Sequence, residues 1–266
     1  MSPPHRDEGD AGAEQAFATP GVAPMGRPTL WNRALMRVVA AVERLNVARA
    51  KLGNRTVYDT ALFPWARDLE REWPAIRAEL DAVLADRERL PAFQDILADV
   101  RTITRDDAWK VFPLGGYGVV SSRNIARCPR TWRAVRRIPG FRSATFSIFE
   151  PGKHLPPHRG AYNGVLRLHL GLVVPRERDK VAIRVGDAVR HWEEGRVLIF
   201  DDAYEHEAWN HSQEIRVVLF VDFVKPLRFP ANIVNRLLLS LAVFTPFVRE
   251  GAENLQEWER RHYPRP

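Results

Sequence analysis

Two histidines and one arginine are the residues of this sequence best suited to carry chemistry. His158 follows the rigid pair Pro156-Pro157, and His206 lies within the acidic segment DDAYEHE at residues 201–207. Arg216 follows on a run of strand-forming residues. Imidazole is the commonest metal ligand in proteins, and a guanidinium can bind a carboxylate through two parallel hydrogen bonds. The pattern therefore predicts a metal held by two imidazoles, with Arg216 placed to bind the carboxylate of an organic ligand.

The third ligand of such a metal is missing from its usual place. Non-haem iron sites commonly add a carboxylate in the order His-x-Asp/Glu…His. This chain instead reads His158-Arg159-Gly160, and glycine has no side chain to donate. Two interpretations stay open: water completes the coordination sphere, or the site no longer binds metal. Asp202 is expected to support the site by orienting an imidazole or a metal-bound water.

Alternating residues predict the strands that must position these groups. In the segment 165–174, leucines at every second position point one way, while Arg167 and His169 point the other. The segment 215–223 repeats the alternation, with Arg216 on the face opposite its aliphatic residues. Because burying an unpaired guanidinium is costly, the polar face is expected to line a wet or ligand-filled cavity.

Further short strands are predicted between turn-forming residues such as Pro151-Gly152 and Gly186-Asp187. They cover residues 146–149, 181–185 and 197–200. Several short strands without intervening helices predict a mainly β fold with flanking helices. The expected architecture is a double-stranded β-helix, a cupin-like jelly roll, rather than a parallel α/β sheet.

Apolar residues at helical spacing predict helices on both sides of the strands. They occur in residues 31–52 and 65–90 and return after Pro230. Glycine, proline and aromatic residues between Trp109 and Pro139 predict a looped region. The expected organisation is a disordered leader at 1–30, an N-terminal helical segment at 31–104, the jelly-roll core at 105–228 and a C-terminal helical extension at 229–266.

The composition limits the classes of partner and compartment. The formal net charge is +7, but the basic residues are scattered and no nucleic-acid-binding motif is present, so no nucleic-acid partner is expected. The single cysteine, Cys128, allows no disulfide within the chain, which fits a reducing compartment. The N-terminus shows no apolar secretory signal, and a cytoplasmic location is expected. No feature of the sequence fixes the oligomeric state.

One apolar segment near the C-terminus bears on membranes. Leu237–Val248 is too short to span a bilayer and is interrupted by Pro246. The segment indicates a core or interfacial helix. Peripheral contact of this C-terminal helix with a membrane surface is the alternative, and the protein would then be membrane-associated.

Four ordered blocks of the sequence resemble one known family. They are EPGKHLPPHRG (150–160), LRLHLGLVVP (166–175), HWEEGRVLIFDDAYEHEAWN (191–210) and RVVLFVDFVKPL (216–227). Together they look like the catalytic domain of aspartyl/asparaginyl β-hydroxylases, which are Fe(II)- and 2-oxoglutarate-dependent oxygenases. The resemblance covers roughly residues 105–228.

The resemblance implies specific roles for residues of this chain. It implies that His158 and His206 are the iron ligands, with 2-oxoglutarate and O2 as co-substrates. Trp109, in the segment WKVFPL, resembles the start of the block that closes the pocket. The residues implied to surround the 2-oxoglutarate carboxylates are Ser147, Arg167, His169 and Arg216.

Two features bear on the substrate. The glycine in His158-Arg159-Gly160 is itself the pattern of the animal enzymes, whereas the related lipid A 2-hydroxylases usually carry HRD. The chain lacks the tetratricopeptide repeats that precede the animal catalytic domain. The first hypothesis is hydroxylation of an Asp or Asn residue of a peptide or protein, or of a related small amino-acid substrate.

Two alternatives accompany that hypothesis. One is a lipid A-type fatty acyl hydroxylase, which the apolar C-terminal segment favours. The other is a non-catalytic ligand-binding β-barrel with a degenerate metal site. The presence of His158, His206 and Arg216 argues against the non-catalytic alternative.

Overall fold

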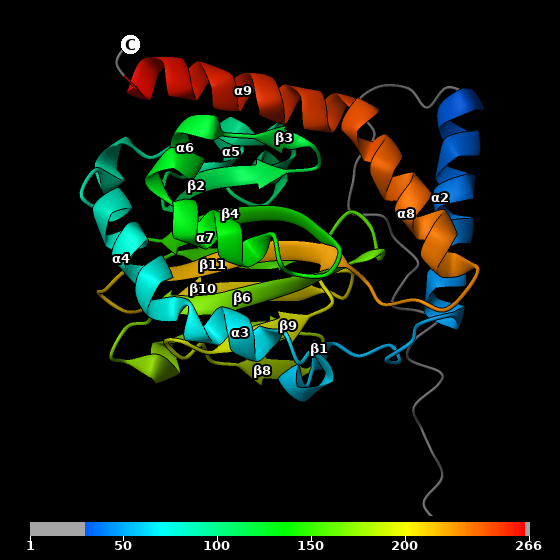
Figure 1. Cartoon of the computed structure of the whole chain (residues 1–266), viewed down its shortest axis with the longest axis horizontal. Helices are drawn as coiled ribbons and strands as arrows, with labels where there is room; N and C mark the ends of the chain where they lie inside the picture. Colours follow the sequence, from blue (N-terminus) through cyan, green and yellow to red (C-terminus); the bar gives the residue numbers. More distant parts are fainter. Residues whose placement is uncertain (1–29, 264–266) are drawn as a thin grey trace, which may run out of the picture.

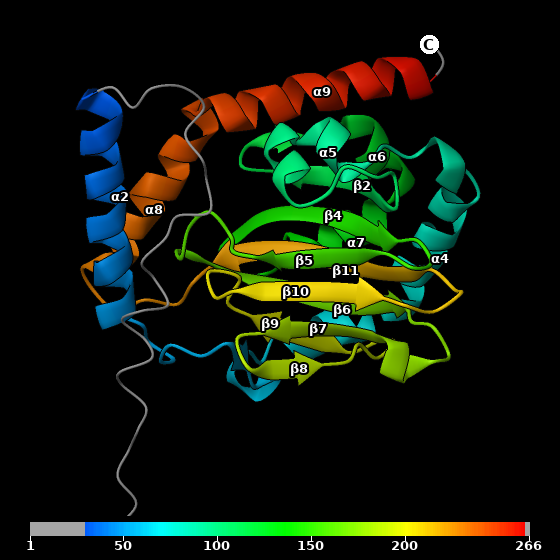
Figure 2. The same cartoon turned by 180° about the vertical axis from the view of Figure 1, so that it is seen from behind.

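Two antiparallel sheets form the centre of the molecule, and helices lie over the larger sheet and along its margins (Figures 1 and 2). The computed structural model describes residues 30–263. The larger sheet has seven strands in the order β1-β9-β6-β11-β4-β2-β3, and the smaller has four in the order β5-β10-β7-β8. The prediction of a mainly β, double-sheet jelly roll is confirmed. The predicted leader lies outside the described residues, apart from Leu30, where the first described helix begins.

The strands in chain order are β1 (Val57–Tyr58), β2 (Trp109–Gly116), β3 (Val119–Val120), β4 (Phe141–Phe149), β5 (His154–His158), β6 (Val165–Val173), β7 (Val181–Val185), β8 (Ala188–Arg190), β9 (Val197–Phe200), β10 (His206–Asn210) and β11 (Arg216–Val224). The α-helices are α2 (Leu30–Ala48), α3 (Ala66–Arg71), α4 (Trp73–Leu84), α5 (Phe93–Ile96), α6 (Ser122–Arg127), α7 (Pro129–Val135), α8 (Ala231–Leu241) and α9 (Pro246–His262). Short 3-10 turns lie at Thr60–Leu62, Arg87–Arg89, Ala98–Thr102, Arg178–Lys180 and Ala242–Phe244.

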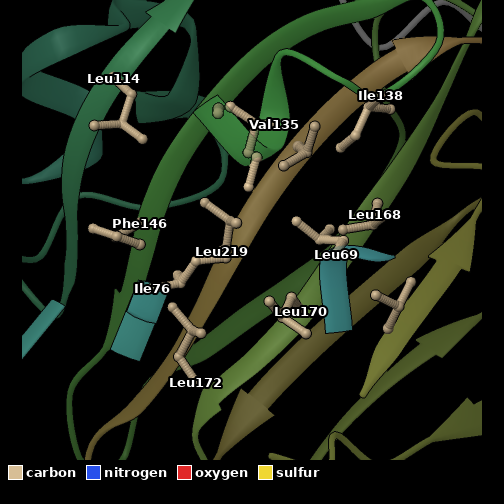
Figure 3. Close-up of a cluster of buried hydrophobic side chains, with 14 of the residues drawn as sticks. Leu69, Ile76, Leu114, Val135, Ile138, Phe146, Leu168, Leu170, Leu172 and Leu219 are labelled. Carbon is tan, nitrogen blue, oxygen red and sulfur yellow. The ribbon is translucent and has the colours of Figure 1, made fainter. Parts of the chain in front are cut away.

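The outer face of the larger sheet packs against helices and forms a continuous apolar core (Figure 3). The leucines of β6 point to this side, as their alternation predicts, and Leu219 of β11 lies beside them. Leu69 of α3 and Ile76 of α4 cover them. Full burial of one such side chain contributes roughly 1.5–3 kcal/mol. This face therefore anchors the strands whose other face carries the polar residues.

The inner face of the larger sheet lies opposite the smaller sheet. This second cluster combines aliphatic side chains with the aromatic residues Trp109, Phe149, Trp192, Phe200 and Phe220. Alternation along β11 sends Val218 and Phe220 to this side, while Val217, Leu219 and Val221 join the outer core. The space between the two sheets is where the candidate functional residues converge.

Two expectations about local structure are wrong. The helix expected over residues 65–90 is broken into α3 and α4, because Pro74 in the first turn of α4 cannot continue a preceding helix. The region 109–139 is not a loop, since it contains β2, β3, α6 and α7. The hydroxyl of Ser121 accepts a hydrogen bond from the backbone N–H of Asn124 and so begins α6.

The first described helix and the C-terminal helices form a unit beside the sheets. α2 and α8 run side by side in opposite directions, and α9 then crosses over the edge of the larger sheet formed by β2 and β3 (Figures 1 and 2). Within the described residues, no helix has the length and apolar character that crossing a bilayer requires.

Candidate active site

The two histidines singled out from the sequence lie side by side on neighbouring strands of the smaller sheet. His158 ends β5 and His206 begins β10, and they are direct partners in the antiparallel ladder. Their ring centroids are 4.1 Å apart. Strand pairing therefore fixes the spacing of two imidazoles that lie far apart in the sequence.

Backbone carbonyls set the tautomer of both rings. Nδ1 of His158 lies 2.8 Å from the carbonyl oxygen of Pro156, and Nδ1 of His206 lies 2.9 Å from that of Tyr204. Because a carbonyl only accepts, each Nδ1 carries the hydrogen and each Nε2 keeps its lone pair. Burial lowers the pKa of His158, and burial together with the neighbouring His158 lowers the pKa of His206 well below its usual value. Both rings are thus neutral and have the protonation that metal ligation requires.

The carboxylate of Asp202 occupies the space that a side chain at position 160 would need. A Cβ built on Gly160 would collide with the carboxylate of Asp202, and the Gly160 N–H donates to the Asp202 carbonyl at 2.7 Å. The Oδ1 atom of Asp202 is buried without a hydrogen-bond partner. Burial raises the pKa of Asp202 to about 7, against the opposing effect of Arg167. Asp202 therefore fills the space beside Gly160 and keeps one carboxylate oxygen without a hydrogen-bond partner.

The described residues contain no group of three or more His, Cys, Asp and Glu side chains that could hold a metal. A metal held by these two imidazoles alone would have coordination positions left for water and for an organic ligand. This arrangement fits the interpretation in which water completes the coordination sphere, and the unpartnered Asp202 oxygen is a suitable acceptor for a hydrogen bond from such a water.

Arg167 is held by two acidic residues of its own chain. Its Nη2 atom lies 2.9 Å from Oδ2 of Asp202, and its Nε atom lies 2.9 Å from Oδ1 of Asp222. The guanidinium stacks over the ring of Phe220 at 4.2 Å. Arg167 thus fixes the orientation of Asp202. The sequence resemblance placed Arg167 among the residues around a bound carboxylate, and that direct contact stays a prediction.

Arg216 is in the opposite electrostatic situation. Its side chain is only 1% exposed, and it forms no ion pair within residues 30–263. Nη1 donates to the carbonyl of Ser147 at 3.3 Å, Nε has no acceptor, and the guanidinium lies 3.6 Å from the ring centre of Phe149 and 4.7 Å from that of Trp192. Burial lowers the pKa of Arg216 to about 9, so it is still a cation at neutral pH. A buried cation without an anion is costly, which points to an anionic ligand.

A second unpartnered donor points to the same ligand. The indole N–H of Trp192 donates to Nδ1 of His169 at 3.2 Å, which places the hydrogen of that neutral ring on Nε2. This Nε2 is buried and has no partner. Burial, reinforced by the charge of Arg216, lowers the pKa of His169 well below its usual value.

Strand register gathers these donors on one inner face. In β4, Ser147 pairs with Val218 of β11, and in β6, His169 pairs with Phe220 two positions further along β11. The hydroxyl of Ser147 accepts from the indole N–H of Trp109 at 2.9 Å, so its own hydrogen is free to donate. The buried donors fit the carboxylate of a small diacid such as 2-oxoglutarate.

Every residue singled out from the sequence lies in or beside this inter-sheet space. His158, His206 and Asp202 lie near Gly160, while Ser147, His169, Arg216 and Trp109 lie on the inner face of the larger sheet. Sequence reasoning missed Trp192, which sets the tautomer of His169, and Phe149, which stacks on Arg216. Trp192 stands in the block HWEEG, but only the folded structure shows that its indole contacts His169.

The chain is similar to several known proteins. The family model for aspartyl/asparaginyl beta-hydroxylase matches residues 70–226. The ornithine lipid ester-linked acyl 2-hydroxylase of Rhizobium tropici is 62% identical over 250 residues, covering 94% of this chain and 89% of the relative. The human aspartyl/asparaginyl beta-hydroxylase is 35% identical over 176 residues, which are 64% of this chain and only 22% of the relative.

Among solved structures, a prolyl-4-hydroxylase of Pseudomonas putida aligns with 58% of this chain and 88% of its own at 18% identity and a TM-score of 0.37. The family match spans more than half of the sequence, and both relatives named above are hydroxylases. The resemblance read from the four blocks is confirmed, and the non-catalytic alternative is set aside. The chain belongs to the aspartyl/asparaginyl β-hydroxylase family and is an oxygenase enzyme.

Proposed function

We propose that this protein is an Fe(II)- and 2-oxoglutarate-dependent hydroxylase of lipid acyl chains, acting at carbon 2 of an ester-linked acyl chain of an ornithine lipid. Of the hypotheses drawn from the sequence, the proposal follows the alternative of a fatty acyl hydroxylase. The proposed substrate is an amino-acid lipid instead of lipid A. The observation that carries the proposal is how far the likeness to the Rhizobium tropici lipid hydroxylase extends.

That likeness reaches beyond the catalytic core. The family model stops at residues 70 and 226, whereas the match to the lipid hydroxylase covers 94% of the chain. The residues outside this match are too few to include the whole segment before residue 70 or after residue 226. The match therefore includes α2 on the N-terminal side of the family model and α8 on the C-terminal side. The human relative, whose name refers to Asp and Asn residues, matches at 35% and over a smaller share of this chain. The flanking helices are therefore shared with an enzyme that acts on a lipid.

The residues present fit the metal and its co-substrate. His158 and His206 would hold iron through their free Nε2 atoms. Arg216, with Ser147 and His169 beside it, would bind a carboxylate of 2-oxoglutarate. When bound, this pair supplies the oxidising power: one atom of O2 enters the substrate C–H bond and the other enters succinate, with release of CO2.

The protein's own residues orient these groups and exclude water. Two backbone carbonyls keep both imidazoles in one tautomer, and Arg167 holds Asp202 beside Gly160. The rings of Phe149 and Trp192 enclose the Arg216 guanidinium, so a carboxylate that binds there exchanges water for a dry, positively charged site.

The test is a turnover assay with separate substrates. The purified protein is supplied with Fe(II), 2-oxoglutarate and O2, together with ornithine lipid or with peptides that contain Asp and Asn. We expect succinate formation to depend on the lipid, with one added oxygen located by fragmentation in the ester-linked acyl chain. Oxygen added to a peptide residue while the lipid stays unmodified would overturn the lipid assignment.

A further inference from the structure

Helix α8 presents apolar side chains to the outside. Leu237 and Leu241 are 61% and 59% exposed, and Ile233 lies one turn before them on the same side. On the opposite side, Asn235 is 0% exposed. α8 also buries Ala231 and Leu239, so it carries apolar residues on both sides, whereas a surface helix usually exposes mainly polar ones.

The exposed stripe continues past both ends of the helix. Phe229 precedes α8 and Phe244 follows it, and both are largely exposed. The α8 apolar face consists of Phe229, Ile233, Leu237, Leu241 and Phe244. Exposed Leu35, Met36 and Val38 lie on the neighbouring α2. Contiguous exposed apolar residues of this kind mark an interaction site rather than an ordinary surface.

The surroundings of the α8 apolar face are cationic. Residues 226–249 contain Arg228, Arg236 and Arg249 and no acidic residue. Within the part of the chain that the structure describes, these three arginines form no ion pair, whereas arginines of the β-core such as Arg184 are paired with glutamates. An apolar face flanked by unpaired arginines complements a surface that is apolar inside and anionic outside, as in a bilayer with acidic lipids.

Buried side chains join this helical unit to the loop that follows the iron ligand His158. The Tyr162 hydroxyl donates to Oδ1 of Asn235 in α8 at 2.7 Å, and Nδ2 of Asn235 donates to the carbonyl of Gly164 at 2.8 Å. From α2, Asn46 donates to Asn163 at 3.0 Å. The asparagine that α8 buries therefore holds the active-site loop against the helix.

We propose that the α8 apolar face, with the adjoining exposed residues of α2, lies in the surface of a membrane that contains anionic lipid. The helix lies on the bilayer and does not cross it. Docking leaves the loop 159–164 on the other side of α8, one helix diameter (~10 Å) from the lipid surface, so the site at His158 lies close to the membrane from which an acyl chain enters. The inference rests on the proposed function for its choice of a lipid substrate, but the docking itself requires no turnover.

The test compares binding to vesicles of two compositions. We expect the wild-type protein to float with vesicles of phosphatidylcholine and phosphatidylglycerol, and to do so less at high salt or with phosphatidylcholine alone. The double variant Leu237→Glu/Leu241→Glu should lower the vesicle-bound to free ratio about tenfold or more, because two charges would enter the apolar layer. The control Val189→Glu places a charge on an apolar residue of β8 that is 43% exposed, and it should bind as the wild type does.

Activity separates docking from the substrate assignment. The double variant should hydroxylate lipid dispersed in detergent at the wild-type rate and lose most of its rate on lipid held in vesicles. Its unfolding temperature should match that of the wild type, since both leucines are exposed. Vesicle binding without any lipid hydroxylation would support docking and overturn the proposed substrate.

Three results would overturn the docking proposal whatever the activity. The first is failure of the wild-type protein to bind anionic vesicles. The second is binding by the double variant that equals the wild type. The third is a homodimer in light scattering that the double variant abolishes, because a second copy of the chain would then cover the α8 apolar face.

Discussion

The two faces of the larger sheet are built from alternate residues of the same strands. The outer face is fully packed, whereas the inner face contains buried polar atoms without hydrogen-bond partners. On the outer face, Leu168, Leu170 and Leu219 pack against helices. On the inner face, Arg216 and His169 are buried with polar atoms that lack partners. Buried polar groups are nearly always satisfied in folded proteins. The outer face therefore stabilises the fold, and the inner face bears an energetic cost that a ligand can offset.

The two buried arginines make the same contrast within the inner face. Arg167 has two carboxylate partners from its own chain, whereas Arg216 has none among the described residues. Arg167 completes an internal network that orients Asp202, and Arg216 is left for an external anion. The strand position of an arginine predicts that it is buried. Only its partners in the structure show whether it belongs to an internal ion-pair network or is available to bind a ligand.

The largest expected effect is loss of the metal. His158→Ala or His206→Ala should abolish Fe(II) binding and succinate formation, because each removes one of two imidazole ligands. Iron content after reconstitution measures the effect. His154→Ala is the matched control, since His154 lies on the same strand but is exposed and contacts Glu207. Full iron occupancy in the His158→Ala/His206→Ala double variant would place the metal elsewhere.

The next effect concerns the packed face. Leu219→Ala should cost about 2–5 kcal/mol in the free energy of unfolding, because Leu219 is fully buried among apolar neighbours. Denaturant unfolding measures the loss, and Val120→Ala at an exposed site should change it little. Affinity of the folded variant for 2-oxoglutarate should match the wild type. A parallel loss of affinity would show that the two faces are not independent.

A third substitution acts on the ligand-binding face. Arg216→Lys keeps the charge but loses the planar fork that can bind a carboxylate twice. A charge-assisted contact of this kind contributes about 1.5–3 kcal/mol, which is on the order of 10–150-fold in affinity. The concentration of 2-oxoglutarate that gives half-maximal succinate production should rise accordingly. Titration curves that overlap would mean that Arg216 serves another ligand.

The smallest expected effect concerns the chemical reactivity of the Cys128 thiol, which lies on the packed side of the larger sheet. Cys128 belongs to the outer core, and burial, assisted by the charge of Glu79, raises the pKa of its thiol to about 12. The reactive thiolate is therefore scarce at pH 8. The native protein should resist iodoacetamide at this pH and react after unfolding, as followed by mass spectrometry. Rapid alkylation of the native protein would contradict the packing described for this face.

The sequence predicted the parts of this structure that depend on local alternation. The strands Val181–Val185 and Val197–Phe200 occur where they were expected, and the faces of β6 and β11 are as predicted. Alternation follows from the geometry of a single strand, so it can be read without knowledge of strand pairing. The segment 109–139 was predicted wrongly because its strand and helices depend on packing against distant residues.

The site could be predicted as a set of residues but not as a set of contacts. His158, His206 and Arg216 were found from their types and positions. The collision between Gly160 and Asp202 and the hydrogen bond from Trp192 to His169 join segments that are distant in the sequence. Gly160, Asp202 and Trp192 lie in connections between strands, whose positions the alternation pattern of one strand does not specify.

The claim that Arg216 awaits an anion is tested most directly by the thermal stability of Arg216→Met. In the absence of ligand the variant should be more stable than the wild type, by about 1–4 kcal/mol, because an unpaired buried charge is replaced by an apolar side chain. Anaerobic addition of Fe(II) and 2-oxoglutarate should then stabilise the wild type, whereas the variant should show only the shift that Fe(II) alone produces. If Arg216→Met is instead less stable than the wild type and still gains stability from 2-oxoglutarate, Arg216 is a structural residue and the account of the inner face is wrong.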